Sequence, residues 1–158
     1  MVSEKNGGIL KSTQLLATYA RETVREYLHV RGTGGETQEE PFAGFRVSSD
    51  RVAQNLVMQH PSVFADNVDD AIATRKMTLM KWLNGEVPTM EYLAEFARLF
   101  RLSPEDVELF ILAAAPALDP GIRELYAYVW NDVRRTCPDI GFVCTLLSVG
   151  DSDAHECY

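Results

Sequence analysis

The stretch TLMKWLNGEVPTMEYLAEFARLFRLSPEDV, residues 78–107, decides the fold because it contains three helix boundaries in close succession. The Asn-Gly pair at 84–85 ends one helix, since both residues readily adopt the left-handed conformation found after a last helical turn. The Pro-Thr pair at 88–89 starts a second helix, and Ser103 followed by Pro104 starts a third. Serine accepts hydrogen bonds from the free N–H groups of a first turn, and proline fits the first helical position. The order of these signals predicts short helices in a compact bundle.

The rest of the chain shows the apolar spacing of three and four residues that is typical of amphipathic helices. The segment GFVCTLLSV, residues 141–149, is apolar without a clear period, and we expect either an edge strand or a packed arm there. The predicted fold class is therefore all-α, a bundle of short helices with, in one alternative, a short C-terminal strand. Besides the helices that follow residues 88 and 103, helices are predicted over residues 12–31, 49–60, 64–73, 76–83 and 120–135.

The formal net charge is -8, and the excess of acidic residues lies in the last third of the chain. Residues 103–158 carry 10 acidic and 3 basic side chains, whereas residues 46–102 carry 7 of each. Proteins that bind nucleic acids usually present a cationic surface, because contacts with phosphates supply most of the non-specific affinity. Any such surface on this chain is expected to be small and local.

No arrangement of residues typical of an enzyme is present. His29 and His60 have no serine, cysteine or acidic residue at a motif spacing, so we predict no catalytic residues and no enzymatic activity. The cysteines are odd in number and include no close pair, which favours free thiols in a reducing compartment over a zinc site completed by His155. They are Cys137, Cys144 and Cys157.

No cofactor or bound metal is predicted either. Asp66, Asp69 and Asp70 lack the periodic spacing of oxygen ligands, and we interpret them as a helix start that the helix dipole favours. The chain contains no apolar run of signal-peptide length, and none of the roughly 18 residues that a membrane-spanning helix needs. We therefore expect a cytoplasmic location.

Residues from about 49 to 107 resemble the lambda-repressor-like (Cro/C1-type, Xre) helix-turn-helix family of DNA-binding proteins. The resemblance rests on TLMKWLNGEVPT at residues 78–89, on Leu93 and Ala97, and on the Leu-Ser-Pro sequence at 102–104. It implies a compact helical domain in which one short helix enters the major groove of double-stranded DNA.

The resemblance also implies how that recognition helix is held. Leu79 and Trp82 would anchor it to the core, and the Asn-Gly pair would close it. A tight turn would separate it from the preceding helix, at the position that Ala73 occupies here.

The residues left on the outer side of this helix suggest the chemistry of DNA recognition. The family's base-reading positions correspond to Lys76, Met77 and Lys81, and lysine can donate to guanine or phosphate while methionine can touch a thymine methyl group. Arg75, Thr78 and Asn84 are suited to hold phosphates, which position a protein without reading sequence. The predicted DNA-binding residues are Arg51, Arg75, Lys76, Met77, Thr78, Lys81 and Asn84.

Two functions follow from these observations. The first is a transcription regulator that binds double-stranded DNA sequence-specifically, as a homodimer, because such modules commonly read two half-sites. The second is a protein-interaction module, comparable to an antitoxin, an anti-repressor or a DNA mimic, that keeps the fold without strong DNA binding. The first is the predicted function, and the second is the alternative that the neutral middle segment and the acidic last third leave open.

The chain divides into a helix and Gly-rich acidic linker at residues 1–45, a helix-turn-helix domain at 46–118, and a C-terminal helix and acidic tail at 119–158. The homodimer would form through the apolar face from Leu15 to Leu28 or through that from Ile122 to Trp130. In the alternative, both faces pack on the bundle of their own chain. The acidic last third could also hold a protein partner.

Overall fold

The computed structural model describes residues 2–31, 68–130, 132, 134, 135 and 137–148. These residues form helices and connecting turns, with no strand among them, which confirms the predicted all-α class. The elements are α1 (Val2–Arg31), α3 (Val68–Leu83), the 3-10 helix η2 (Pro88–Met90), α4 (Glu91–Phe100), α5 (Pro104–Leu118), α6 (Pro120–Val129) and α7 (Ile140–Leu147).

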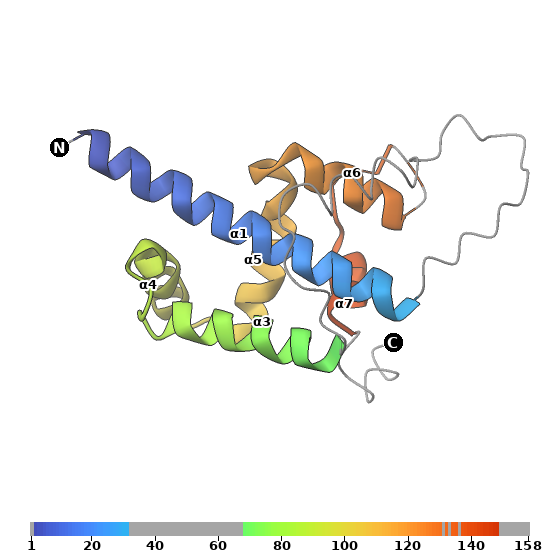
Figure 1. Ribbon diagram of the computed structural model, residues 1–158, viewed down its shortest axis with the longest axis horizontal. Helices are drawn as coiled ribbons and strands as arrows, with labels where there is room; N and C mark the ends of the chain where they lie inside the picture. The colour runs from blue at the N-terminus through green and yellow to red at the C-terminus, as the bar shows by residue number, and fades with distance from the viewer. Residues whose placement is uncertain (1, 32–67, 131, 133, 136, 149–158) are drawn as a thin grey trace, which may run out of the picture.

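Helix α1 is the axis of the molecule. It crosses the whole width of the structure, with α6 on one side and α3 on the other, and its N-terminal end projects beyond the body (Figure 1). It contacts α3, α5, α6, α7 and η2. The predicted helix over residues 12–31 is thus confirmed in type, but it begins earlier, at Val2.

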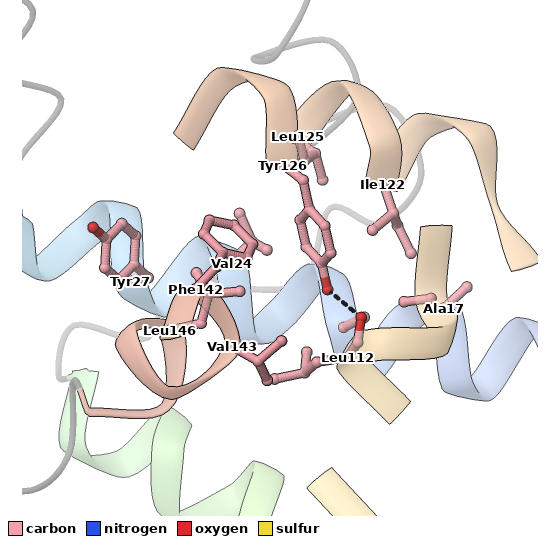
Figure 2. Packing of buried hydrophobic residues seen from close by; sticks show 12 residues of the cluster. Ala17, Val24, Tyr27, Leu112, Ile122, Leu125, Tyr126, Phe142, Val143 and Leu146 are labelled. Carbon is pink, nitrogen blue, oxygen red and sulfur yellow. Dashed lines mark hydrogen bonds between the residues drawn. The ribbon is translucent and has the colours of Figure 1, made fainter. Parts of the chain in front are cut away.

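Apolar residues of α1 pack into two separate cores. Val24 and Tyr27 lie in the first core, where α1 meets α5, α6 and α7 (Figure 2). The Tyr126 hydroxyl of α6 points across this core and donates a 2.8 Å hydrogen bond to the Leu112 carbonyl of α5. Tyr19 lies in the second core, together with residues of α3, η2, α4 and α5.

Trp82 is the largest side chain of α3 in the second core, where it is 3% exposed. Its ring lies 5.5 Å from that of Tyr19, centroid to centroid, so it braces α3 directly against α1. Leu79, one turn earlier, is buried in the same core. The prediction that Leu79 and Trp82 face inward is confirmed.

The helix boundaries predicted between residues 78 and 107 are present. Helix α3 ends at Leu83, and Gly85 follows with a φ of 76°, in the left-handed region that glycine adopts without strain. Helix α5 begins with a capping box, in which the Ser103 hydroxyl accepts from the Asp106 N–H and the Asp106 carboxylate accepts from the Ser103 N–H. Short-range signals therefore set the ends of these helices.

The predicted turn near Ala73 is wrong. Residues 68–83 form one continuous helix, so the separate helices expected over 64–73 and 76–83 are a single α3 where the structure describes them. Nothing in the sequence Ala-Thr-Arg at 73–75 breaks a helix, and the buried residues of α3 follow one helical stripe: Ile72, Arg75, Leu79 and Trp82. The helix predicted over 49–60 lies outside the described residues.

The apolar segment near the C-terminus forms a helix, and the edge strand offered as one alternative is wrong. Helix α7 is capped by Asp139, whose carboxylate accepts a 2.8 Å hydrogen bond from the Phe142 N–H. Phe142, Val143 and Leu146 then pack into the first core at helical spacing (Figure 2). The preceding helix α6 is shorter than predicted, because it ends at Val129.

Both faces considered for a dimer contact are buried within the chain. The apolar residues of α1 between 15 and 28 fill the two cores, and Ile122, Leu125 and Tyr126 of α6 lie in the first. The alternative, that they pack on their own bundle, is therefore correct. The three predicted segments of the chain also share these cores, because α1 and α6 both pack against α5.

Candidate interaction surfaces

The outer face of α3 carries the lysines expected there. Lys76 and Lys81 are exposed, and Met77 is 58% exposed, on the side opposite Leu79 and Trp82. The indole of Trp82 packs the opposite side of the helix against the second core, so these side chains project from a helix that is held in place. The expected exposure of Lys76, Met77 and Lys81 is confirmed, whereas contact of any of them with DNA stays a prediction.

Two other predicted phosphate-binding residues make local hydrogen bonds. Thr78 is half-buried as a residue, and its hydroxyl donates a 2.9 Å hydrogen bond to the Thr74 carbonyl. The Asn84 side-chain amide is exposed and donates to the Glu86 carboxylate at 3.3 Å. Arg51 lies outside the described residues.

Arg75 does not belong to the outer face. Its side chain is 4% exposed and points inward between α1 and α5. Its Nε donates to the Glu26 carboxylate at 2.8 Å, and its Nη1 donates to the Glu108 carboxylate and, at 2.8 Å, to the Tyr19 hydroxyl. A guanidinium held in this way has no path to a phosphate, so the prediction that Arg75 contacts DNA is wrong.

These four side chains form a buried polar cluster, which we call the Arg75 cluster: Tyr19, Glu26, Arg75 and Glu108. Burial raises the pKa of Glu26, an effect that its ion pair with Arg75 only partly offsets. Burial alone lowers the pKa of Arg75, but Tyr19 and the two carboxylates bring the net shift upward. The cluster contains two carboxyl groups for one guanidinium, so its charges balance only when one carboxyl is protonated.

The charge on the outer side of α3 is mixed. Asp69 and Asp70 are exposed in its first turn, Lys76 and Lys81 follow, and Glu86 comes directly after the helix. With Arg75 turned inward, the three exposed acids on this surface outnumber the two exposed lysines. A continuous positive stripe, which would favour nucleic-acid binding, is not formed by the described residues of this helix.

The second exposed feature is apolar and was not predicted. Helical spacing alone would put Phe96 and Phe100 of α4 on the inward face with Leu93 and Ala97, but Phe96 is half-buried and Phe100 is 60% exposed. They lie with other exposed apolar side chains on a surface that we call the aromatic face. Its members are Tyr92, Phe96, Leu99 and Phe100 of α4 and Phe110 of α5.

Ring contacts make the aromatic face continuous across two helices. The Phe96 ring lies 4.9 Å from that of Phe100 and 4.9 Å from that of Phe110, measured between centroids. Tyr92 and Leu99 are 79% and 73% exposed on the same side of α4, because residues four and seven positions apart share one helix face. The sequence signal for the aromatic face was therefore a second apolar stripe on α4, at a helical spacing but on a different side from Leu93 and Ala97.

The outer side of α5 extends this apolar surface. Between Asp106 and Asp119 the helix has one charged residue, Glu108, and that residue is buried in the Arg75 cluster. The exposed positions next to Phe110 are the alanines 113 and 117. A helix that is apolar on all sides is normally covered on all sides, yet no described element covers this one on its outer face.

Other kinds of site find no support in the described ranges. They contain no cluster of His, Cys, Asp or Glu side chains suited to a metal ion. Cys137 and Cys144 are exposed free thiols. Among the helices that the structure describes, none combines the length and the apolar character needed to cross a membrane.

No family model, no curated protein and no solved structure matches the chain. The resemblance to the lambda-repressor-like family therefore rests on the sequence signals between residues 78 and 107.

Proposed function

We propose that this protein is a protein-interaction module whose docking surface is the aromatic face of α4 and α5. The observation that carries the proposal is the exposure of Tyr92, Phe100 and Phe110 side by side with Leu99. Scattered apolar residues are ordinary on a protein surface, but a continuous patch of this kind marks an interaction site.

The size of the patch supports this reading. Aromatic side chains bury about 150–250 Å² each, so Tyr92, Phe100 and Phe110, at exposures of 79%, 60% and 44%, leave roughly 370 Å² in water. At about 25 cal/mol per Å² the covering of that area is worth about 9 kcal/mol before the entropic cost of association. Leu99 adds to this figure.

The shape of the patch indicates the kind of partner. The exposed residues of α4 recur at four and seven positions and form a ridge along one helix, beside the smaller side chains of α5. Such a ridge fits the apolar side of another helix, packed at the interaxial distance of about 8–10 Å that helix pairs adopt.

Site-specific photocross-linking tests the proposal. A photoreactive residue in place of Leu99 should give a defined cross-linked adduct in cells, whereas the same residue in place of Lys76 should not. The partner identified by mass spectrometry should then bind the purified chain and lose affinity for Tyr92→Ser/Leu99→Ser. Equal labelling at both positions, or binding that survives the double substitution, would overturn the proposal.

A second candidate function, sequence-specific DNA binding by a homodimeric transcription regulator, is favoured by one observation. Lys76, Met77 and Lys81 project from a helix braced by Trp82, and an α-helix fits the major groove. With few phosphate contacts, its affinity would depend only weakly on salt.

Gel retardation of genomic fragments discriminates this candidate. DNA binding by the wild type that is lost in Lys76→Glu/Lys81→Glu supports it. The same mobility of DNA with both proteins at low salt excludes it. The aromatic-face variant Tyr92→Ser/Leu99→Ser is the matched control, because its substitutions leave the outer side of α3 unchanged.

A further inference from the structure

We infer that the partner on the aromatic face is a second copy of this chain, packed with its α4 antiparallel to the first. The inference rests on the proposed docking function and adds the identity of the occupant. It is carried by the distribution of charge along α4 and by the area of the patch.

Charge is ordered along α4. The N-terminal half carries Glu91 and Glu95, and the C-terminal end carries Arg98 and Arg101, all exposed. Glu95 and Arg98 already form a 3.5 Å pair within the helix at the boundary between the two halves. When two such helices lie antiparallel, the acidic half of each faces the basic end of the other. The pattern is therefore complementary to itself.

This complementarity matters because the chain as a whole is acidic, with a net charge of -8. Two copies repel one another over most of their surface, and contact is favoured where the local charge is balanced. The two acids and two arginines of α4 provide such a region. A symmetric pair uses the same patch on both chains, as isologous dimers do.

The identity of residue 101 fits this arrangement. Arg101 follows α4 with a φ of 55°, in the left-handed conformation that a helix C-terminus commonly gives to glycine. That conformation is strained for a residue with a side chain. The chain thus keeps a positive charge at this end of α4 where glycine would be less strained.

The area also agrees with a self-association contact. A standard interface takes about 800 Å² from each partner, with an apolar centre and a polar rim. The exposed aromatic rings supply roughly half of that area, by the exposures given above. The charged side chains of α4, which line a hollow between α3 and α4 at one edge of the patch, and the exposed alanines of α5 can supply the remainder.

The mass of the full chain in solution is the first test. Light scattering at micromolar concentrations should give twice the chain mass of 17.7 kDa. Tyr92→Ser/Leu99→Ser, in which both altered side chains are largely exposed, should stay folded by circular dichroism and give the monomer mass. A wild-type mass of one chain at every concentration would overturn the inference.

Charge reversal tests the antiparallel arrangement. Arg98→Glu/Arg101→Glu makes α4 wholly acidic, and Glu91→Arg/Glu95→Arg makes it wholly basic. Each variant alone should dimerise at least about tenfold more weakly than the wild type, which corresponds to about 1.4 kcal/mol. An equimolar mixture of the two should regain the wild-type affinity as a heterodimer, and failure to do so would refute the antiparallel contact. Lys76→Glu/Lys81→Glu, altered on α3, should dimerise like the wild type.

The outcome at Leu99 separates this inference from the proposed function. Cross-links from that position to a second copy support both. Cross-links to a different protein, together with a monomeric wild type, overturn the second copy and leave the docking function standing. A monomeric wild type with no specific cross-link at Leu99 overturns both.

Discussion

Arg75 donates a 2.8 Å hydrogen bond to the hydroxyl of Tyr19, and this contact joins α3 to α1 in the interior of the molecule. The guanidinium also lies over the Tyr19 ring, 5.1 Å from its centroid. A residue predicted to touch DNA thus holds the bundle together. Its ion pairs with Glu26 of α1 and Glu108 of α5 link three helices at one point.

Replacement of Arg75 is therefore expected to destabilise the fold. Arg75→Met removes the positive member of a buried cluster and leaves two carboxyl groups without a counter-charge, a change that typically costs about 3–5 kcal/mol. Urea unfolding followed by circular dichroism measures the loss. Lys76→Met, at the adjacent exposed position, should change the free energy of unfolding by less than about 0.5 kcal/mol. Equal stability of the two variants would contradict a structural role for Arg75.

The raised pKa of Glu26 predicts a particular pH dependence. Burial raises this pKa in the folded protein above its ordinary value of 4.5, so the protonated form is the one that folding favours. The contribution of Glu26 to the free energy of unfolding is fully present when the pH is below its ordinary pKa. This contribution is lost as the pH rises through the raised pKa of the folded protein. Glu26→Gln cannot titrate, so its stability relative to the wild type should increase as the pH rises from 4.5.

Urea midpoints measured for both proteins across this range test the sign. The difference between the two midpoints could fail to vary with pH, or could change in favour of the wild type as the pH rises. Either result would be inconsistent with a Glu26 carboxyl protonated by burial.

Trp82 is expected to contribute most of the packing between α3 and α1. Trp82→Ala leaves a cavity beside Tyr19 and should cost about 3–5 kcal/mol, as for other buried aromatic residues. Met80→Ala, on the partly exposed side of the same helix, is the matched control and should cost much less. Thermal unfolding of both variants provides the measurement, and a similar decrease in Tm would argue against the brace.

The capping box at the start of α5 gives a smaller effect. Ser103→Ala removes the acceptor for the Asp106 N–H and should cost about 0.5–2 kcal/mol. Hydrogen bonds from the Ser103 backbone and side chain lower the pKa of Asp106, so its contribution is present at neutral pH and is lost as the pH falls through that lowered value. Chemical denaturation at neutral pH should detect the loss in Ser103→Ala, and an unchanged midpoint would speak against the cap.

The sequence predicted those features that depend on neighbouring residues. The last residue of α3 follows from the Asn-Gly pair, and the first residue of α5 follows from Ser103. The inward position of Trp82 follows from helical spacing. The turn near Ala73 was predicted wrongly, because the resemblance required a break that the local residues do not favour. The helix continues through that position along one buried stripe that includes Arg75.

The burial of Arg75 depends on residues that are distant in the sequence. Glu26 is 49 positions away and Glu108 is 33 positions away, and no short-range pattern associates these three side chains. The exposure of Phe100 likewise depends on where α5 lies relative to α4, which helical spacing alone does not determine. Sequence analysis therefore recovered much of the helix pattern but not the aromatic face.

Helix α1 has a consequence for how the protein unfolds. Tyr19 and Val24 lie little more than one helical turn apart, yet each belongs to a different core. One core therefore cannot loosen without disturbing the helix that the other requires. Amide hydrogen exchange should accordingly show the interior of α5 and α6 opening together with α3, as one cooperative unit.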